Sequence, residues 1–304
     1  MQSRAWLTPL SALVLAGLAT GYAAIWLFAA IDHAALGRMA IVPFVGVLGA
    51  IIANTSGTGG GVVFIPVFNI LSAENVLPLT PARILGASFL IQCFGMTMGA
   101  LTWLRATHKN IPARTGIPAP QFWRMIALVL LVSAPVMLAT QRFVHVDART
   151  TLVAFKIFSV ALGTALLAVT WTFNRNAPER IGLNRFDTVT LVLLSALGGF
   201  ATALFSVGTG ELLALYLFLR HFPLNTCSAS AVIASSASVL MGGVHHILAG
   251  TVPWEVVALA APGAILGGFL ARRIAHWLGP LRLKTLVGLW IVLSGLFLIF
   301  ANIQ

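Results

Sequence analysis

Long apolar runs follow one another along the whole of this 304-residue chain. Hydrophobic residues make up 59% of the sequence, charged residues make up only 8%, and the mean hydropathy is +0.98. A soluble domain carries roughly a quarter charged residues, whereas about 20 consecutive apolar residues are enough to cross a bilayer as a helix. The sequence therefore predicts an all-α polytopic membrane protein without a separate soluble domain.

Seven of the apolar segments are long enough to span a bilayer alone without an internal break. The first, residues 6–30, is too long for a signal peptide and lacks a small-residue cleavage site, so we expect a retained anchor. The later segments are expected at 39–55, 60–72, 82–104, 121–141, 149–172, 188–206, 211–219, 226–248, 254–271 and 285–302.

Two pairs of these segments are interrupted by glycine-rich sequence. Ser56–Gly59 joins 39–55 to 60–72, and Val207–Gly210 joins 188–206 to 211–219. The second member of each pair is too short to cross a bilayer. Each pair is therefore expected to form a broken hairpin that dips into the membrane and returns. Two tilted crossings would give the same sidedness and remain an alternative.

The distribution of cations predicts the orientation. With the N-terminus inside, thirteen of the 18 Lys and Arg residues fall in inner loops and four in outer loops, and Lys156 lies within a span. Inner loops of membrane proteins carry an excess of Lys and Arg. We therefore expect a bacterial inner-membrane protein with a cytoplasmic N-terminus and an outer C-terminus. No basic run is interleaved with aromatics, so the net charge of +11 does not indicate nucleic-acid binding.

The chain resembles itself. The triplet GTG occurs at Gly57–Gly59 and at Gly208–Gly210, WRMIAL at Trp123–Leu128 corresponds to WEVVAL at Trp254–Leu259, and TLVAF corresponds to TLVGL further along. These matches keep the same order. They predict an internal repeat.

The repeat divides the single membrane domain into an N-terminal helix (1–35), a first unit (36–172), a cytoplasmic linker (173–186) and a second unit (187–303). Each unit is expected to contain a broken hairpin followed by three spans, and this odd number inverts the second unit relative to the first. Secondary transporters often have inverted repeats, with the substrate site near the midplane where discontinuous helices meet.

The glycine loops suit an anion site at that depth. Non-helical backbone in a membrane is tolerated only inside protein or beside a watery cavity. The short helix after each loop begins with unpaired N–H groups and a partial positive charge. Two such helix starts aimed at one point would bind an anion. The alternative is that small residues only allow close helix packing. The glycines fit neither a P-loop nor a dinucleotide fingerprint.

The sequence SGTGGGVVFIP, followed by ARILGASFL, resembles the TauE/SafE family of sulfite exporters and toluene-sulfonate permeases. The stretch HHILAGTVPWEVVALAAPGAILGGFLARRIA resembles the second half of the same family. The resemblance extends over about residues 36–302 and implies transport of anions such as sulfite, thiosulfate or organosulfonates, without fixing the direction. The second loop departs from the family pattern because Glu211 replaces a glycine.

The candidate substrate-binding residues are the two loops and the small polar residues that precede or follow them. Ser88, Ser235 and Ser236 resemble the family's small-Ser helix, and they either donate to substrate or permit close packing; Gln92 is a weaker candidate. The full set is Asn54, Thr55, Ser56, Gly57, Thr58, Gly59, Gly60, Ser88, Ser206, Gly208, Thr209, Gly210, Ser235 and Ser236.

Three titratable residues are candidates for coupling, with a proton as the candidate coupling ion. Glu211 either carries a proton or only caps its helix. Lys156 either attracts the anion or extends to the outer surface. His245, beside His246 near the outer end of a span, is either a proton relay or an interfacial residue. Tryptophans near the span ends, including Trp103, are expected to form an interfacial belt.

Our leading hypothesis is a secondary transporter of small sulfur-containing anions that works by alternating access. The alternative is an anion-selective channel that uses the same loops as a filter. An enzyme is not expected, because no catalytic dyad, metal cluster or cofactor motif is visible. Cys93 and Cys227 lack metal-ligand spacing. The expected partners are a small anion and the lipid bilayer, and a homodimer is left open.

Overall fold

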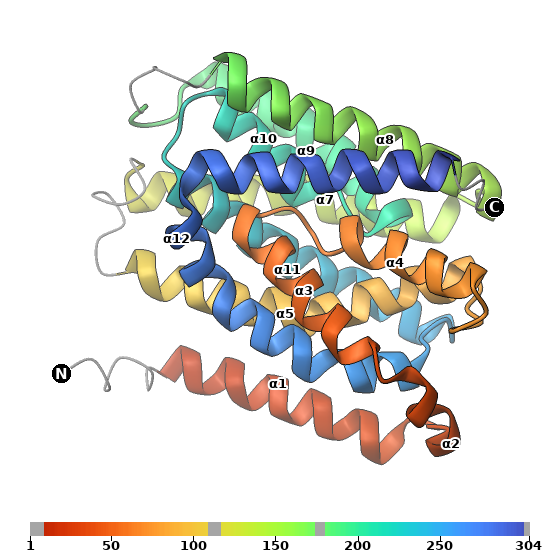
Figure 1. Ribbon diagram of the computed structural model, residues 1–304. Helices are drawn as coiled ribbons and strands as arrows, with labels where there is room; N and C mark the ends of the chain where they lie inside the picture. Colours follow the sequence, from red (N-terminus) through yellow and green to blue (C-terminus); the bar gives the residue numbers. More distant parts are fainter. Residues whose placement is uncertain (1–8, 109–116, 174–179, 301–304) are drawn as a thin grey trace.

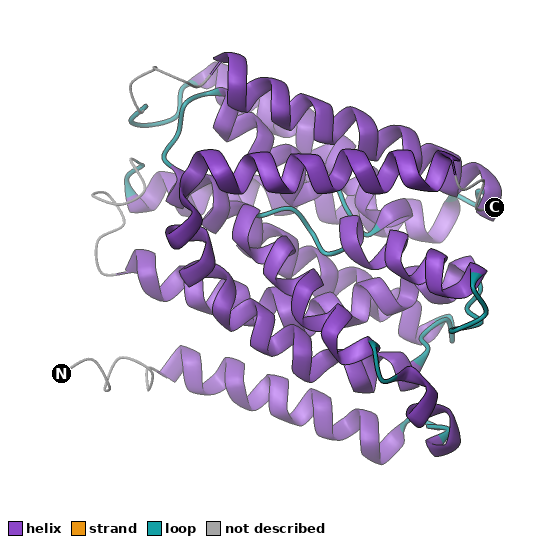
Figure 2. Ribbon diagram, in the orientation of Figure 1, coloured by secondary structure: helices purple, strands orange, loops and turns teal. Residues whose placement is uncertain are grey.

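The computed structural model describes residues 9–108, 117–173 and 180–300. Every regular element in these residues is helical, and the helices form one bundle (Figures 1 and 2). Eight of the described helical segments are long and apolar enough to cross a membrane. This confirms the all-α polytopic class. The count exceeds the seven unbroken spans expected because α9, in the second broken pair, is itself 21 residues long.

The elements follow the expected order. The first part of the chain forms α1 (Pro9–Phe28), the short α2 (His33–Leu36) and η2 (Gly37–Met39), then α3 (Val42–Ser56), α4 (Gly61–Ala73), α5 (Pro81–His108), α7 (Ala119–Phe143), α8 (Ala148–Ala168) and its π-helical continuation η3 (Val169–Phe173). The second part forms α9 (Arg185–Phe205), α10 (Thr209–Leu219), α11 (Leu224–Leu248) and α12 (Trp254–Phe300). Helix α12 bends at Gly279, which has a φ of 73°, into two spans.

The two broken hairpins open at opposite ends of the bundle. Helix α3 starts at the right-hand end of Figure 1 and α4 returns to it, whereas α9 starts and α10 ends at the left-hand end. The helices that return, α4 and α10, have only 13 and 11 residues. Three spans follow each hairpin, namely α5, α7 and α8 after the first and α11 and the two halves of α12 after the second. This arrangement is the expected inverted repeat of a broken hairpin plus three helices, preceded by α1.

Left-handed residues end the first helix of each hairpin. Gly57 caps α3 with a φ of 78°, and Ser206 caps α9 with a φ of 55°. A residue in this conformation stops a helix and turns the chain, and glycine adopts it without a steric penalty. The sequence predicted that Thr209 and Gly210 belong to the second loop. In the structure α10 begins at Thr209, so both residues lie in its first turn.

Glycines on α3 and α12 bring the two helices into backbone contact. A Cβ atom on Gly46 would lie 2.3 Å from the carbonyl oxygen of Ala260, and one on Gly263 would lie 2.2 Å from that of Pro43. Small residues at such crossings allow the close packing on which membrane helices depend. Close packing therefore explains these glycines, which lie outside the loops.

Trp103 corrects the prediction of an interfacial tryptophan belt. Its side chain is fully buried, and its indole Nε1–H donates to the carbonyl oxygen of Asn54 at 2.9 Å. It therefore ties α5 to α3 inside the bundle. Trp123, Trp171 and Trp277 are exposed, as the prediction requires.

Asp187 holds together the open end of the second hairpin. Its carboxylate is completely buried and accepts hydrogen bonds from the Tyr216 hydroxyl at 2.7 Å and from the Arg220 Nε at 2.9 Å. Arg180 makes an ion pair with it at 3.1 Å, and the Asn184 backbone N–H donates to it at 2.8 Å. One carboxylate thus joins the segment before α9, the start of α9 and the end of α10.

Replacing Asp187 by asparagine should lower the thermal unfolding midpoint in detergent by several degrees. Removing one partner of a buried ion pair lowers the free energy of unfolding by about 3–5 kcal/mol. Because the two arginines are partly exposed, we expect a loss at or below the lower end of that range. The matched control is Glu255→Gln, because Glu255 meets the exposed Arg83 at 3.8 Å and such pairs contribute about 0–1 kcal/mol. Equal midpoints for the two variants would refute this role for Asp187.

The orientation of the bundle in the membrane is open to direct measurement. Four of the inner cations that support the predicted orientation, Arg4, Lys109, Arg114 and Arg175, lie outside the described residues. Glu74 follows α4 and Ile181 lies shortly before α9, and both are exposed. The end of α4 and the start of α9 lie at opposite ends of the bundle (Figure 1).

Single cysteines at Glu74 and Ile181, in a background with Cys93 and Cys227 replaced by alanine, should therefore react from opposite sides. A membrane-impermeant maleimide is expected to label Glu74→Cys in intact cells and Ile181→Cys only in inside-out vesicles. Labelling of both from one side would contradict the inversion, and the reverse pattern would contradict an inner N-terminus.

Candidate functional site

The two helix breaks meet inside the bundle at the carboxylate of Glu211. Glu211 is the third residue of α10 and is only 2% exposed to solvent. The Gly59 backbone N–H, from the first loop, donates to its Oε1 atom. The Gly208 backbone N–H, from the second loop, donates to its Oε2 atom at 2.7 Å. One carboxylate therefore binds an amide from each repeat.

Gln92 makes a second bridge between the loops from the neighbouring helix α5. Its Oε1 atom accepts from the Gly60 backbone N–H at 2.6 Å, and its Nε2 atom donates to the Ser206 Oγ at 2.7 Å. The hydroxyl and carbonyl oxygens of Ser88, one turn earlier on α5, each accept from the same Nε2 atom at 3.1 Å. Ser88 therefore orients Gln92.

Hydroxyl groups pair with the other free amides of the two loops. The Thr209 backbone N–H donates to the Thr202 Oγ1 at 2.9 Å. In the first loop the Thr58 backbone N–H donates to the Ser56 Oγ at 3.3 Å, and the two hydroxyls lie 2.7 Å apart. Backbone groups at membrane depth need such partners within the protein. These hydrogen bonds therefore help to fix the conformation of each loop.

A small cavity remains between the loops. Its volume is about 10 Å³, which is about the space that one water molecule requires. Ser238 on α11 faces it with a side chain that is 1% exposed and an Oγ atom without a hydrogen-bond partner in the described structure. The lining residues are Gly59, Gln92, Thr202, Ser206, Val207, Gly208, Thr209, Glu211, Ser235, Ser238 and Val239.

Two glycines are required by the close approach of the loops. A Cβ atom on Gly59 would lie 2.8 Å from the Glu211 Oε1 and 3.1 Å from the Gln92 Oε1. A Cβ atom on Gly210 would lie 1.9 Å from the Ser235 Oγ. A side chain at Gly59 would push apart groups from both repeats, and one at Gly210 would push α10 away from α11.

The structure brings only part of the predicted binding set to this cavity. Gly59, Ser206, Gly208, Thr209 and Ser235 line it. Gly57, Ser56, Thr58 and Gly60 form the rest of the first loop, and Gly210 packs against Ser235.

Four other predicted residues make contacts elsewhere. Asn54 donates to the carbonyl oxygens of Ala50 and Gly95, so it joins α3 to α5. Thr55 bonds within its own helix, and Ser236 meets the Thr97 hydroxyl at 3.1 Å. Ser88 acts through Gln92.

Two of the three coupling candidates also lie away from the loops. Lys156 is buried on α8, where its backbone lies against Gly295 of the second half of α12, and it does not line the cavity. His245 lies near the end of α11 with its ring 5.4 Å from that of His246. Of these candidates, only Glu211 is placed between the loops.

The sequence reasoning missed Thr202 and Ser238 and gave Gln92 too little weight. Ser238 lies three residues after Ser235, and this spacing puts both side chains on one face of α11. Thr202 lies one turn before Ser206 on α9, and this spacing could have predicted that its side chain lies beside the second loop. Nothing in the sequence pattern distinguishes Gln92 from other polar residues within spans.

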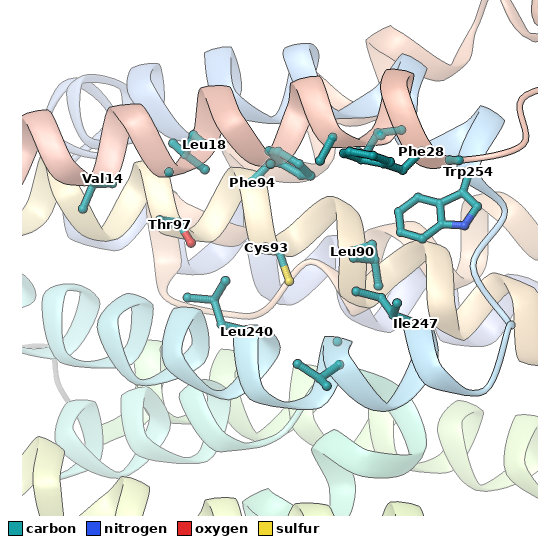
Figure 3. A pocket seen from close by; sticks show the side chains of 17 residues that line it. Val14, Leu18, Phe28, Leu90, Cys93, Phe94, Thr97, Leu240, Ile247 and Trp254 are labelled. Carbon is teal, nitrogen blue, oxygen red and sulfur yellow. The ribbon is translucent and has the colours of Figure 1, made fainter.

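A much larger cavity of about 650 Å³ lies between α1, α5 and α11. Its lining is apolar, with Leu18, Phe94 and Leu240 around it and Cys93 and Thr97 as its few polarizable or polar side chains (Figure 3). Such a lining suits hydrocarbon and offers little to an anion. Among the described residues, no group of three His, Cys, Asp or Glu side chains is placed to hold a metal ion.

Comparisons with known proteins agree with this architecture. The family model "Sulfite exporter TauE/SafE" matches residues 42–298. A curated relative, "Probable membrane transporter protein YunE" of Bacillus subtilis (strain 168), is 23% identical over 282 residues, which are 86% of this chain and 98% of the relative. No solved structure matches the chain. The match begins at the start of α3 and ends within the last helix, so it contains both hairpins and leaves α1 outside. The chain belongs to the TauE/SafE family of membrane transporters.

Proposed function

We propose that this protein is a secondary transporter of small sulfur-containing anions, namely organosulfonates, sulfite or thiosulfate, and that the anion binds between the two loops. The family name supports the substrate class. The observation that carries the site is the convergence of the Gly59 and Gly208 amides, from inverted repeats, on one carboxylate. Backbone amides at helix starts are suited to anions.

No cation is needed at this site. The ion pairs of the described residues join Arg83 to Glu255 and both Arg180 and Arg220 to Asp187, and none involves Glu211. The charge of a carboxylate is therefore balanced by amides and helix starts alone. A sulfonate or sulfite group resembles a carboxylate in being negatively charged, and it has more oxygen atoms that can accept hydrogen bonds. The Ser235 and Ser238 hydroxyls supply further donors next to the same cavity.

Alternating access follows from the position of the site between the repeats. Residues 36–172 contribute Gly59 and Gln92, and residues 187–303 contribute Gly208, Glu211 and Ser238. Movement of one unit against the other would open the site to one side at a time. The cavity, at about 10 Å³, provides no continuous path for an ion, which favours a carrier over a channel.

Proteoliposomes should take up radiolabelled sulfite, thiosulfate or a short alkanesulfonate with saturable kinetics and stimulation by the same anion on the opposite side. Gly59→Val should abolish this uptake, because its side chain would displace Glu211 and Gln92. Gly17→Val is the control, since no atom lies within 4 Å of a Cβ atom at that position of α1. Non-saturable flux without counter-flow stimulation would indicate the channel, and retained uptake by Gly59→Val would refute the site.

Replacing Ser238 by alanine should weaken anion binding about tenfold or more, because a hydrogen bond to a charged group contributes about 1.5–3 kcal/mol. Ser159→Ala is the matched control, because Ser159 on α8 is also buried without a described hydrogen-bond partner but lies outside the cavity. Titration calorimetry with thiosulfate measures both. Equal affinities in the two variants would exclude Ser238 from the site.

A further inference from the structure

The Glu211 carboxylate occupies the position that the proposed function assigns to the transported anion. Its Oε1 and Oε2 atoms accept the amide protons of Gly59 and Gly208, which are the donors with which the loops would bind a substrate. The remaining cavity, at about 10 Å³, has space for about one water molecule. A sulfonate group and the carboxylate therefore cannot bind these amides together.

A second observation indicates that the place is built for a larger group than the carboxylate. The Ser238 Oγ is buried against the cavity and has no hydrogen-bond partner in the described structure. A buried hydroxyl without a partner is costly, and Glu211 satisfies only the two loop amides there. A tetrahedral anion with three or four oxygens could bind both amides and this hydroxyl.

Displacement leaves the carboxylate without its donors at membrane depth. An ionised carboxylate in such surroundings is very unfavourable, and a proton is the simplest means of neutralising it. No ion pair of the described residues offers Glu211 a cation instead.

We infer that Glu211 is a tethered substitute for the substrate, that the transported anion displaces its carboxylate from the Gly59 and Gly208 amides, and that the freed carboxylate takes up one proton from solution. This inference rests on the proposed function. Each anion that binds is thereby accompanied by one proton, and the pair can cross the membrane together. The expected substrate is an anion that remains ionised under the conditions in which the freed Glu211 carboxylate takes up a proton.

No other titratable side chain competes for this role at the cavity. The elements that form it carry further described ionisable groups, but none of those groups lines it. They are Arg83, Cys93 and Arg105 on α5, Arg185 and Asp187 on α9, Tyr216 on α10, and Cys227, His245 and His246 on α11. Lys284 of α12 packs against α10, with its Nζ atom 3.8 Å from the centroid of the Phe218 ring, and it does not line the cavity either. The described residues of α3 and α4 contribute no ionisable side chain. The pH dependence of binding should therefore report Glu211.

The test is the affinity of the purified protein for thiosulfate and for methanesulfonate, whose charges stay constant between about pH 5 and about pH 8, the range in which a buried carboxyl titrates. The affinity should rise as the pH falls, with a slope that approaches tenfold per pH unit, the value for one proton taken up per anion. Calorimetry in two buffers of different ionisation enthalpy should give the same proton count directly.

Glu211→Gln should bind the anions more tightly than the native protein at about pH 8 and should lose the pH slope, because its amide group is neutral at every pH. Glu255→Gln is the matched control, since this acid lies outside the cavity, in an ion pair with the exposed Arg83, and should keep the native slope. The proton count of the native protein tests the inference even if Glu211→Gln does not fold.

The outcomes separate the inference from the function on which it rests. Binding by the native protein that does not change with pH, or a pH slope that survives in Glu211→Gln, would overturn the role of Glu211 and leave the proposed function intact. An absence of binding by both proteins at every pH would overturn both. Loss of the slope in Glu255→Gln as well would assign the proton elsewhere.

Discussion

Backbone amides that two helix breaks leave without helical partners determine the centre of this protein. Gly59, Gly60, Gly208 and Thr209 each present an N–H group at a depth where lipid offers no acceptor. The protein supplies the acceptors from Glu211, Gln92 and Thr202. The Gly59–Glu211 bond crosses between the repeats, and Gln92 also donates to Ser206, so two of the groups that satisfy the loop amides also hold the two loops together.

The glycines serve two different purposes, which the sequence alone could not assign to positions. On α3 and α12 they bring helix backbones into contact, as at Gly46 and Gly263, and these positions form the scaffold. In the loops they let the tips approach the Glu211 and Gln92 side chains, as at Gly59. Close packing is therefore compatible with the proposed anion site, because the loops meet only if the surrounding helices pack tightly.

The helix breaks and the inversion were predictable because they depend on local features: apolar length, glycine position and loop charge. The partners of the loops were not, because they depend on how α5 and α11 are rotated about their own axes. Helix α11 carries serines at 228, 230, 235, 236 and 238, so its composition does not say which face meets the loops. Gln92 and Ser238 face them, whereas Ser236 faces Thr97. For the same reason the sequence did not predict the role of Asp187 and placed Trp103 wrongly at the membrane interface, since their contacts are distant in sequence.

The two loops are related by the repeat but are not equivalent, and the difference has a mechanical consequence. Only the second hairpin carries an acid beside its loop, and the carboxylate of this Glu211 binds an amide of the first loop, so Glu211 ties the two units at the point where the proposed alternating access would require them to separate. With a glycine at this position the tie would be absent. Under the proposed function, any event that removes the carboxylate from Gly59 would both vacate the anion position and free one unit to move against the other. Binding would then depend on both amide bonds of Glu211, whereas movement would depend on the Gly59 bond alone, because Gly208 and Glu211 belong to the same unit.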